Sequence, residues 1–513
     1  MICIPITGST QEEALLQIET SLSRADVLEL RMDLISGDLK TLMEKCRSYP
    51  ISVKILVTNR RRESSSSEDM PGEGERERIA VLKEAVRLGA DYVDVELYTP
   101  GALRKDVLAT AGAHGNRTKV IISHHDFSKT PSFKTLKNIF RRCIESGVSV
   151  AKIVTLAKNP EDNFAVLSLI PYARDRKNDV IAFCMGEQGK ESRILAPLLG
   201  SYLSFASLRD GLASASGQLT IGEMEDIMNL AGQGVYREDK LSVPPNARLF
   251  GLLGNPVKQS LSPLMHDAVL KKMKIAARYL PFCVQDIGSA VRGMRGIGIC
   301  GVSVTVPFKV AVMEHLDETD ADARKIGAVN TIVNDKGRLK GFNTDWIGLI
   351  KSIGEVMDIK GKVFSILGAG GTARAAVFGI EREGGISVIV NRNVARGENL
   401  AKEWGCSFYP LSELGRVRAD CLINTTPVGM IPNVDESPVS SAIIVKYRWV
   451  VDVIYNPLKT RLVRDAEKVG CITVPGISMF VHQGAEQIRL WTGQEAPREF
   501  MKQVVMERLL YGN

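Results

Sequence analysis

A lysine stands in the middle of an apolar segment in the first half of the chain. The segment Val150–Leu156 (VAKIVTL) has the small and β-branched residues typical of a buried strand, and its third residue is Lys152. Burying a cation is costly, so such surroundings favour the neutral amine, which attacks a ketone to form a Schiff base. Lys152 is therefore a candidate nucleophile, and a lysine at the strand edge that reaches into water is the alternative.

Acid–base groups and ion pairs accompany this lysine on other strand-like segments. The motif SHHDF ends one of them, and a histidine there, such as His125, can act as general acid and base near neutral pH. Two further segments each carry polar side chains two residues apart, which places them on one face of a strand: Glu29 with Arg31, and Asp94 with Glu96. Taken alone, a histidine pair is more often structural or solvent-facing, and a surface ion pair explains Glu29 and Arg31 equally well.

The second half of the chain contains a pattern that suits a dinucleotide phosphate. An apolar segment, Val363–Leu367, leads through the turn 368–371 (GAGG) into TARAA, a good helix start. The glycines let a pyrophosphate approach the backbone, and the N–H groups of the helix start point at it. The next strand-like segment lacks the acidic residue of an NAD site and is followed by Asn391, Arg392 and Arg396. Cations there suit a 2′-phosphate, so we expect NADP; a structural turn beside solvated arginines is the alternative.

A lysine and an aspartate in the second half could move a proton beside this nucleotide. Lys309 ends the strand-like motif SVTVPFK, and Asp345 ends GFNTD, with the amide of Asn330 between them in the sequence. Such a pair beside a nicotinamide can exchange the proton that accompanies hydride transfer to a ketone. Simpler explanations exist for the separate parts, because Lys309 fits a surface charge and the earlier SLSP motif fits a helix cap.

These residues need elements that bring them together. The first half contains eight short apolar segments separated by helix-length stretches, which predicts a (β/α)8 barrel. The polar, proline-ended stretch 233–245 indicates a linker between a barrel of residues 1–232 and a second unit of residues 246–513. Within that unit we expect a substrate lobe, made of residues 246–345 and the C-terminal helices, and a Rossmann-type NADP-binding lobe of about residues 346–478. The expected fold class is α/β throughout.

Composition narrows the class of protein. The 513 residues exceed the size of one core, and the hydrophobic and charged fractions of 44% and 24% are ordinary for a globular enzyme. A net charge of +7 without a long basic block does not favour nucleic acid, and nine cysteines without zinc spacing predict reduced thiols and no metal. No apolar segment has membrane-spanning length. We expect a cytoplasmic protein, or a plastid one if a transit peptide has been removed.

The motifs of the first half of the chain occur in an order that is typical of one enzyme family. ELRMDL, TNR, VDVEL, SHHDF, AKIVTLA, MGEQGKESR and ASASGQ resemble the motifs of type I 3-dehydroquinate dehydratases over essentially all of residues 1–230. The resemblance implies Lys152 as the Schiff-base lysine, His125 as general acid and base, and Glu96 as the residue that orients the histidine. It further implies substrate contacts by Glu29, Arg31, Arg60, Arg193, Ser214 and Gln218. Ser216 stands where these enzymes usually have proline.

The second half closely resembles shikimate dehydrogenases over roughly residues 246–513, through GNPVKQSLSP, SVTVPFK, GAVNT, GFNTDWIG, GAGGTARA, NRN, INTTPVGM, DVIYNPLKT and SMFVHQGAEQIRLWTG. The resemblance implies Lys309 and Asp345 as the catalytic pair. It implies substrate contacts by Ser260, Ser262, Thr305, Asn330, Tyr455 and Gln483. With the turn and the arginines above, the expected NADP site comprises Gly368, Ala369, Gly370, Gly371, Asn391, Arg392, Arg396, Thr425 and Gly476. Ser303 and Asn393 replace the asparagine and threonine common at those positions.

Together the resemblances predict a bifunctional enzyme of the shikimate pathway, a lyase joined to an oxidoreductase, similar to the fused enzyme of plants and some bacteria. The first site is expected to dehydrate 3-dehydroquinate to 3-dehydroshikimate, and the second to reduce that product to shikimate with NADPH. A dehydratase fused to a quinate dehydrogenase is one alternative, which Ser260, Ser262 and Thr305 disfavour. A regulator that binds the acids without turning them over is the other, and the intact catalytic groups disfavour it.

Overall fold

The computed structural model describes residues 1–48, 53–61, 73–224, 248–257 and 259–511. The chain divides into two compact units, one of Met1–Asn246 with Arg292–Gly298 and the other of Ala247–Val291 with Ile299–Asn513. The expected linker 233–245 lies outside the described residues.

The first unit is a nearly closed parallel barrel, as the sequence predicts. Its strands pair in the order β7-β6-β5-β4-β3-β2-β1-β8, and the backbone N–H of Tyr202 donates to the carbonyl of Val180 in β7 across the remaining gap (2.9 Å). The strands are β1 (Ile2–Ile6), β2 (Val27–Arg31), β3 (Lys54–Thr58), β4 (Tyr92–Glu96), β5 (Lys119–Asp126), β6 (Val150–Leu156), β7 (Asp179–Met185) and β8 (Ser204–Phe205).

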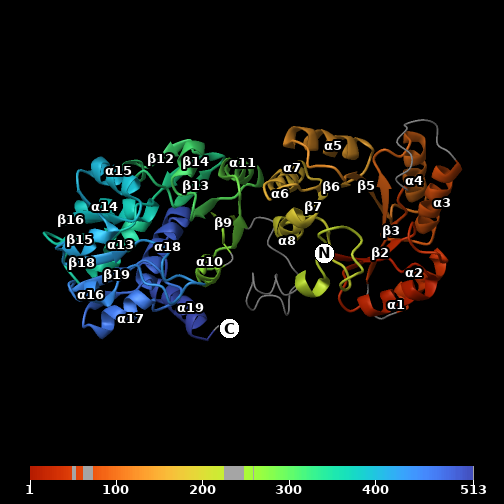
Figure 1. Ribbon diagram of the computed structural model, residues 1–513. Coiled ribbons are helices and arrows are strands. Elements are labelled where there is room, and N and C mark those ends of the chain that lie inside the picture. Colours follow the sequence, from red (N-terminus) through yellow and green to blue (C-terminus); the bar gives the residue numbers. More distant parts are fainter. Residues whose placement is uncertain (49–52, 62–72, 225–247, 258, 512–513) are drawn as a thin grey trace. The chain divides into compact units, whose positions relative to one another are not determined.

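Helices alternate with these strands and lie outside the ring (Figure 1). Their local signals are ordinary ones: Ser132 caps α5 by accepting from the N–H of Thr135, and the buried residues of that helix recur with helical spacing at Leu136, Ile139, Phe140 and Cys143. The helices are α1 (Gln11–Ser21), α2 (Leu39–Arg47), α3 (Glu73–Arg87), α4 (Gly101–Ala113), α5 (Phe133–Glu145), α6 (Asp162–Leu167), α7 (Leu169–Arg174) and α8 (Lys190–Leu199).

The second unit contains two six-stranded sheets. The first has the order β10-β9-β11-β13-β14-β12 and is mixed, because β13 runs antiparallel to both of its neighbours. Its strands are β9 (Arg248–Gly254), β10 (Ala277–Cys283), β11 (Gly301–Val304), β12 (Glu318–Thr319), β13 (Thr331–Asp335) and β14 (Arg338–Phe342). Helices α10 (Ser262–Lys272), α12 (Ala321–Ile326) and α13 (Asp345–Gly354) belong to this region, and α11 (Ile287–Ile297) begins in it.

The second sheet is parallel, and its order β17-β16-β15-β18-β19-β20 is that of the Rossmann fold. Its strands are β15 (Val363–Leu367), β16 (Ile386–Asn391), β17 (Ser407–Pro410), β18 (Cys421–Asn424), β19 (Trp449–Asp452) and β20 (Ile472–Val474). Its helices are α14 (Gly371–Arg382), α15 (Val394–Trp404), α16 (Ser441–Ile444) and α17 (Arg461–Lys468). The predicted α/β class with a Rossmann-type lobe is therefore confirmed.

The C-terminal helices, α18 (Gly476–Thr492) and α19 (Arg498–Tyr511), return to the first sheet of this unit. Phe480, Ile488 and Trp491 of α18 share one apolar core with Phe250 and Leu252 of β9. This packing places one face of α18 beside the strand ends that carry the candidate substrate residues.

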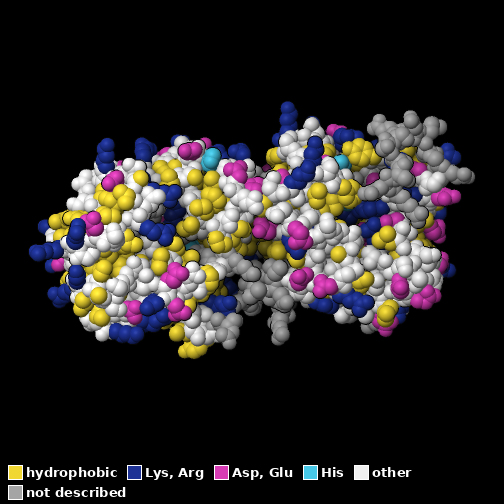
Figure 2. Space-filling model, viewed as in Figure 1, with side chains coloured by type: hydrophobic (Ala, Val, Ile, Leu, Met, Phe, Trp, Pro, Cys, Tyr) yellow, Lys and Arg dark blue, Asp and Glu magenta, His cyan; other side chains and the backbone are white. Residues whose placement is uncertain are grey.

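The surface of the protein is mixed in charge. On the face drawn in Figure 2, Lys and Arg side chains are interspersed with Asp and Glu over both units, in keeping with the moderate net charge of +7. Among the helices that the structure describes, none combines the length and the apolar character needed to cross a membrane.

Candidate active sites

The amine of Lys152 lies inside the barrel between two carboxylates. Its Nζ donates to Asp94 Oδ2 on β4 at 2.9 Å and lies 3.8 Å from Glu29 Oε1 on β2. It also lies 4.3 Å from the ring centroid of Phe205 on β8. The buried position agrees with the sequence prediction, but the surroundings are not simply apolar, because two buried acids face the amine. The structure therefore places Lys152 in an ion pair with Asp94.

Asp94 lies at the centre of this site. From the sequence it was expected only as a neighbour of Glu96 on one strand, without a role of its own. Its Oδ2 accepts from Lys152 and also from Arg60, at 3.2 Å. Burial alone raises the pKa of Asp94, but Lys152 and Arg60 lower it more, so the pKa lies well below its usual range. The alternation of apolar and acidic residues in VDVE could have indicated this role, because it places Asp94 on the same face of the strand as Glu96.

His125 faces the same group of charges. Its Nδ1 lies 3.0 Å from an N–H of Arg60, and because a guanidinium only donates, this ring nitrogen is the acceptor. Burial, Arg60 and Lys152 lower the pKa of His125 well below its ordinary value, against a smaller opposing effect of Asp94. The imidazole is therefore neutral at physiological pH, and the nitrogen that can accept a proton is Nδ1, which Arg60 contacts.

Glu96, expected to orient the histidine, has other partners. Its Oε2 accepts from the backbone N–H of Arg61 at 3.1 Å and lies 3.4 Å from Arg78. Its Oε1 lies 4.0 Å from Arg60, which holds His125. In the structure, Glu96 thus reaches the histidine through Arg60 rather than by a direct bond.

Arg193 is a buried cation that lacks a full set of acceptors. Its side chain is 1% exposed, and within the described part of the chain its Nε has no hydrogen-bond partner. One terminal N–H reaches the carbonyl of Ser216 at 3.5 Å, and burial lowers the pKa of the guanidinium to about 10. A buried guanidinium with an unused donor suits a substrate carboxylate. Because Ser216 acts through its carbonyl, proline at that position would offer the same acceptor.

The remaining expected contacts of the barrel site have local partners. Arg31 is paired with Asp33 at 2.7 Å, and Glu29 accepts from Thr58 Oγ1 at 2.7 Å. In the last loop, Gln218 Oε1 accepts from the N–H and the hydroxyl of Ser214, at 2.7 and 3.1 Å. These bonds hold polar side chains near the ends of the strands, which is where barrels carry their active sites.

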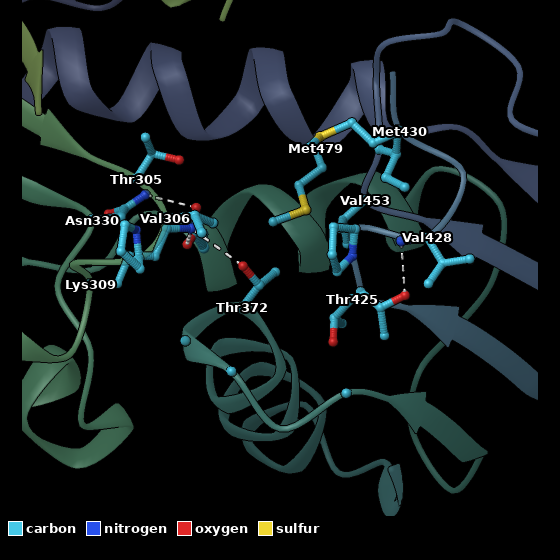
Figure 3. Close-up of a pocket in the computed structure, with 18 of the residues that line it drawn as sticks. Thr305, Val306, Lys309, Asn330, Thr372, Thr425, Val428, Met430, Val453 and Met479 are labelled. Atoms are coloured by element: carbon cyan, nitrogen blue, oxygen red, sulfur yellow. Dashed lines mark hydrogen bonds and ion pairs between the residues drawn. The ribbon is translucent and has the colours of Figure 1, made fainter. Parts of the chain in front are cut away.

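The second unit contains a cavity of about 850 Å³ that joins the two groups expected there (Figure 3). At one end gather Thr305, Lys309 and Asn330, and the apolar Met430 and Val453 lie at the other. The expected catalytic and substrate residues that line it are Ser260, Ser262, Thr305, Lys309, Asn330, Asp345, Tyr455 and Gln483. The expected nucleotide residues that line it are Gly368, Ala369, Gly370, Gly371, Asn391, Arg392, Arg396 and Thr425.

The lysine and the aspartate of this cavity form a short ion pair. Lys309 Nζ lies 2.6 Å from Asp345 Oδ2, and Asn330 Nδ2 donates to the other carboxylate oxygen at 2.8 Å. Asn330 is itself fixed, because its Oδ1 accepts from the backbone N–H of Thr344 at 2.7 Å. Both oxygens of Asp345 are therefore held, and the ammonium faces the cavity.

A buried hydrogen-bond chain supports this group, and sequence reasoning missed it. The hydroxyl of Tyr279 donates to Ser303 Oγ at 2.8 Å, and Ser303 donates to Gln487 Oε1 at 2.9 Å. Gln487 then donates to Thr331 Oγ1 at 3.1 Å, and Thr331 donates to Asn330 Oδ1 at 2.9 Å. Ser303, noted as a departure from the family pattern, thus links Tyr279 to Gln487 in this series of hydrogen bonds.

The nucleotide end of the cavity fits a dinucleotide. Gly368 has φ of 120°, and a Cβ there would lie 2.5 Å from Thr425 Oγ1, so only glycine suits this turn. A Cβ on Gly370 would meet nothing within 4 Å, so its backbone faces open space that a phosphate can enter. The exposed Arg392 and Arg396 line the cavity beyond β16.

Two residues near the nucleotide site have structural roles: Gly476, an expected member of the site, and Asn393, which replaces the threonine common at its position. A Cβ on Gly476 would lie 2.5 Å from the backbone of Ile454, so this glycine allows α18 to start against the loop after β19. Asn393 caps α15, since its Oδ1 accepts from the N–H of Arg396 at 3.0 Å. Gly476 is also absent from the residues that line the described cavity.

Comparison with known proteins identifies a family for each unit. The family model for type I 3-dehydroquinase matches residues 2–235. The model for the substrate-binding domain of shikimate dehydrogenase matches residues 252–332, and that for the C-terminal domain of shikimate 5′-dehydrogenase matches residues 476–506.

Some relatives match nearly the whole chain, and others match about half of it. The chloroplastic bifunctional 3-dehydroquinate dehydratase/shikimate dehydrogenase of Arabidopsis thaliana is 34% identical, over 98% of this chain and 84% of that protein. The NADP(+) shikimate dehydrogenase of Pyrococcus abyssi is 43% identical, over 51% of this chain and 98% of that protein. A solved shikimate dehydrogenase structure in complex with NADP+ is 37% identical, with a TM-score of 0.50, over 52% of this chain and 98% of that one. The chain therefore belongs to the family of bifunctional enzymes of the shikimate pathway that join a 3-dehydroquinate dehydratase to an NADP-dependent shikimate dehydrogenase.

Proposed function

We propose that the barrel dehydrates 3-dehydroquinate through a Schiff base on Lys152. The amine, after giving up a proton, adds to the substrate ketone, and the ketone oxygen leaves as water. The resulting iminium draws electrons from the neighbouring carbon, so the neutral His125 can remove a proton there through Nδ1, once Arg60 has turned from that nitrogen to the substrate. That proton then goes to the departing hydroxyl, which leaves as a second water. Hydrolysis of the iminium restores Lys152 and releases 3-dehydroshikimate.

The charges around Lys152 support these roles. Asp94 and Glu29 hold the amine at the centre of the barrel, and Arg60 bridges Asp94 to His125. Arg193 is buried, its Nε has no partner among the residues that the structure describes, and in this proposal it binds the substrate carboxylate. The lowered pKa of His125 keeps the ring unprotonated, which is the form that a general base requires.

In the second unit, we infer that Lys309 and Asp345 serve the reduction of 3-dehydroshikimate to shikimate. NADPH, when bound, supplies the hydride. The Lys309 ammonium donates a proton to the carbonyl oxygen as negative charge develops on it, and Asp345 stabilises the ammonium before the transfer. Ser260, Ser262, Thr305 and Gln483 orient the substrate, and Arg392 with Arg396 holds the 2′-phosphate.

The observation that carries the proposal is that each unit holds a complete constellation. Lys152, His125 and their carboxylates lie within one barrel, and the Lys309–Asp345 pair opens into the cavity that the glycine turn also lines. Because the product of the first site is the substrate of the second, the two constellations describe one reaction sequence. The cytoplasmic or plastid location stays a prediction.

Variants of the two lysines test the proposal, each serving as the control for the other. Lys152→Ala is expected to abolish formation of 3-dehydroshikimate from 3-dehydroquinate and to leave reduction of 3-dehydroshikimate intact. Lys309→Ala is expected to give the reverse. Borohydride added with 3-dehydroquinate should fix one substrate-derived group on Lys152, read by peptide mass spectrometry. Labelling of another lysine, or loss of both activities in either variant, contradicts the proposed roles.

A further inference from the structure

The side chain of Lys309 packs directly on the nucleotide-binding turn. A Cβ built on Gly371, the third glycine of that turn, would lie 3.1 Å from Lys309 Cβ and 3.3 Å from its Cδ. Both distances are tighter than ordinary carbon contacts, so the methylene chain of the lysine follows the bare backbone of the glycine. The turn that suits a pyrophosphate is thus also the surface on which the lysine rests.

Thr372, the residue that follows the turn, contacts the ammonium of Lys309. Lys309 Nζ lies 3.3 Å from Thr372 Oγ1, which is positioned as an acceptor, and Figure 3 draws this bond. Thr372 is the second residue of α14, whereas the other acceptor, Asp345, is the first residue of α13. An ammonium has three N–H donors. With these two acceptors among the described residues, the third N–H remains for the substrate oxygen.

Two lobes therefore set the direction of one catalytic group. The backbone of Lys309 is fixed in the substrate lobe, where its carbonyl accepts from the N–H of Val329 at 2.7 Å. The free end of the side chain is shared between Asp345 of that lobe and Thr372 of the nucleotide lobe. Any shift of the nucleotide-binding turn would change the second acceptor of the ammonium.

We propose that Thr372 is a positioning residue for Lys309 in the reduction. Its hydroxyl stabilises the ammonium and aims its remaining N–H at the substrate carbonyl, and through it the nucleotide-binding turn sets the geometry of proton transfer. The inference rests on the proposed role of Lys309 as proton donor. It assigns to the first turn of α14 a contribution to the chemical step in addition to nucleotide binding.

The test compares Thr372→Val, which keeps the shape and removes the hydroxyl, with Thr372→Ser, which keeps the hydroxyl. Loss of one hydrogen bond to a charged group predicts a fall in kcat of about tenfold for Thr372→Val. Thr372→Ser should stay within about threefold of the unaltered enzyme. The alkaline limb of the kcat–pH profile should move to lower pH in Thr372→Val alone, because the ammonium form of Lys309 has lost an acceptor. The affinity for NADP+, measured by fluorescence titration, should change less than kcat.

Thr492→Val is the matched control. Thr492, in the same unit near the end of α18, makes a hydroxyl bond to the carbonyl of Ile488 at 2.7 Å and is not among the residues that line the cavity. This control should leave kcat and the pH profile unchanged. The inference is overturned if Thr372→Val retains full kcat, if Val and Ser lower it equally, or if NADP+ affinity alone changes. Measuring Lys309→Ala alongside separates the two ideas, since retained activity in that variant contradicts the proposed function itself.

Discussion

Lys152 Nζ lies 2.9 Å from Asp94 Oδ2, and the two side chains are 4% and 1% exposed. Two opposite charges are thus buried together in the centre of the barrel, with Arg60 as a second cation beside the same carboxylate oxygen. Removing one partner of a buried pair leaves the other uncompensated, at about 3–5 kcal/mol. The pair therefore links the stability of the barrel to the ionisation and position of the nucleophile.

Asp94→Asn should damage the dehydratase selectively. The amide keeps the volume of the side chain and removes the charge that holds Lys152, so we expect kcat for dehydration to fall by about a hundredfold or more. The ultraviolet absorbance of the enone product measures this rate. Reduction of 3-dehydroshikimate by the same protein is the internal control and should be unchanged. An Asn variant with full dehydratase activity contradicts the role given to Asp94.

The pH dependence of dehydration should show the lowered pKa of His125. Burial, Arg60 and Lys152 all disfavour the imidazolium, so the ring stays neutral to a pH below the ordinary histidine value of 6.5. The acid limb of kcat/KM should therefore lie below that pH. Arg60→Gln removes one cation, which raises the pKa of His125 and moves the limb upward. A limb at or above 6.5 in the unaltered enzyme, or a downward shift in the variant, argues against His125 as the base.

Selectivity for NADP should depend on Arg392. This exposed side chain lines the cavity beyond β16, whereas Asn393 is occupied as the cap of α15. Loss of a charge-assisted contact to the 2′-phosphate predicts a fall of about tenfold to a hundredfold in kcat/KM for NADPH in Arg392→Gln. The value for NADH should change little. Equal losses with both cofactors contradict the assignment.

The contribution of His266 to the stability of the dehydrogenase unit should decrease on acidification. Its Nδ1 donates to the carbonyl of Ser262, and burial lowers the pKa of the ring to about 4, from an ordinary 6.5. The unfolded chain therefore binds the proton more tightly, and the contribution of His266 to the free energy of unfolding should fall by about 3 kcal/mol as pH drops through this interval.

His266→Phe isolates this contribution. It keeps the ring that stacks on Tyr279 and removes the titration, so the free energy of unfolding of the variant, measured relative to the unaltered protein, should rise by about 3 kcal/mol as pH drops from 6.5 to 4. Asp267, whose pKa burial raises to about 7, acts with the opposite sign but is present in both proteins. All four tryptophans (346, 404, 449 and 491) belong to the second unit, so their fluorescence during urea unfolding reports that unit. If the free energies of unfolding of the unaltered protein and of His266→Phe change equally with pH, the contribution assigned to His266 is wrong.

Contiguous features could be predicted from the sequence because their determinants are local. The strand around Lys152 and the strand–turn–helix at 363–376 each lie within one short segment, and the structure contains both. The alternation of side chains along a strand likewise selected Glu29 with Arg31. The order of strand-like and helix-length segments along the chain was then enough to predict the barrel and the Rossmann-type sheet.

Partners from distant strands could not be predicted in this way. Lys152 and Asp94 lie on β6 and β4, which come together only because both pair with β5, and no local pattern predicts that pairing. Ser303 and Gln487 are 184 residues apart and join only after α18 packs back on the first sheet. Gly476 has a packing role that its place in the family motif does not show: its lack of a side chain lets α18 start against the backbone of Ile454. Its contact with the nucleotide stays a prediction.

The central claim is that one chain performs both steps in series. The most direct test is a single cuvette containing the protein, 3-dehydroquinate and NADPH, with NADPH absorbance followed over time. The unaltered enzyme should oxidise NADPH, Lys152→Ala and Lys309→Ala should each fail alone, and a mixture of the two variants should restore oxidation. Direct oxidation of NADPH by Lys152→Ala with 3-dehydroquinate would contradict the account, because it would show a quinate dehydrogenase in the second unit.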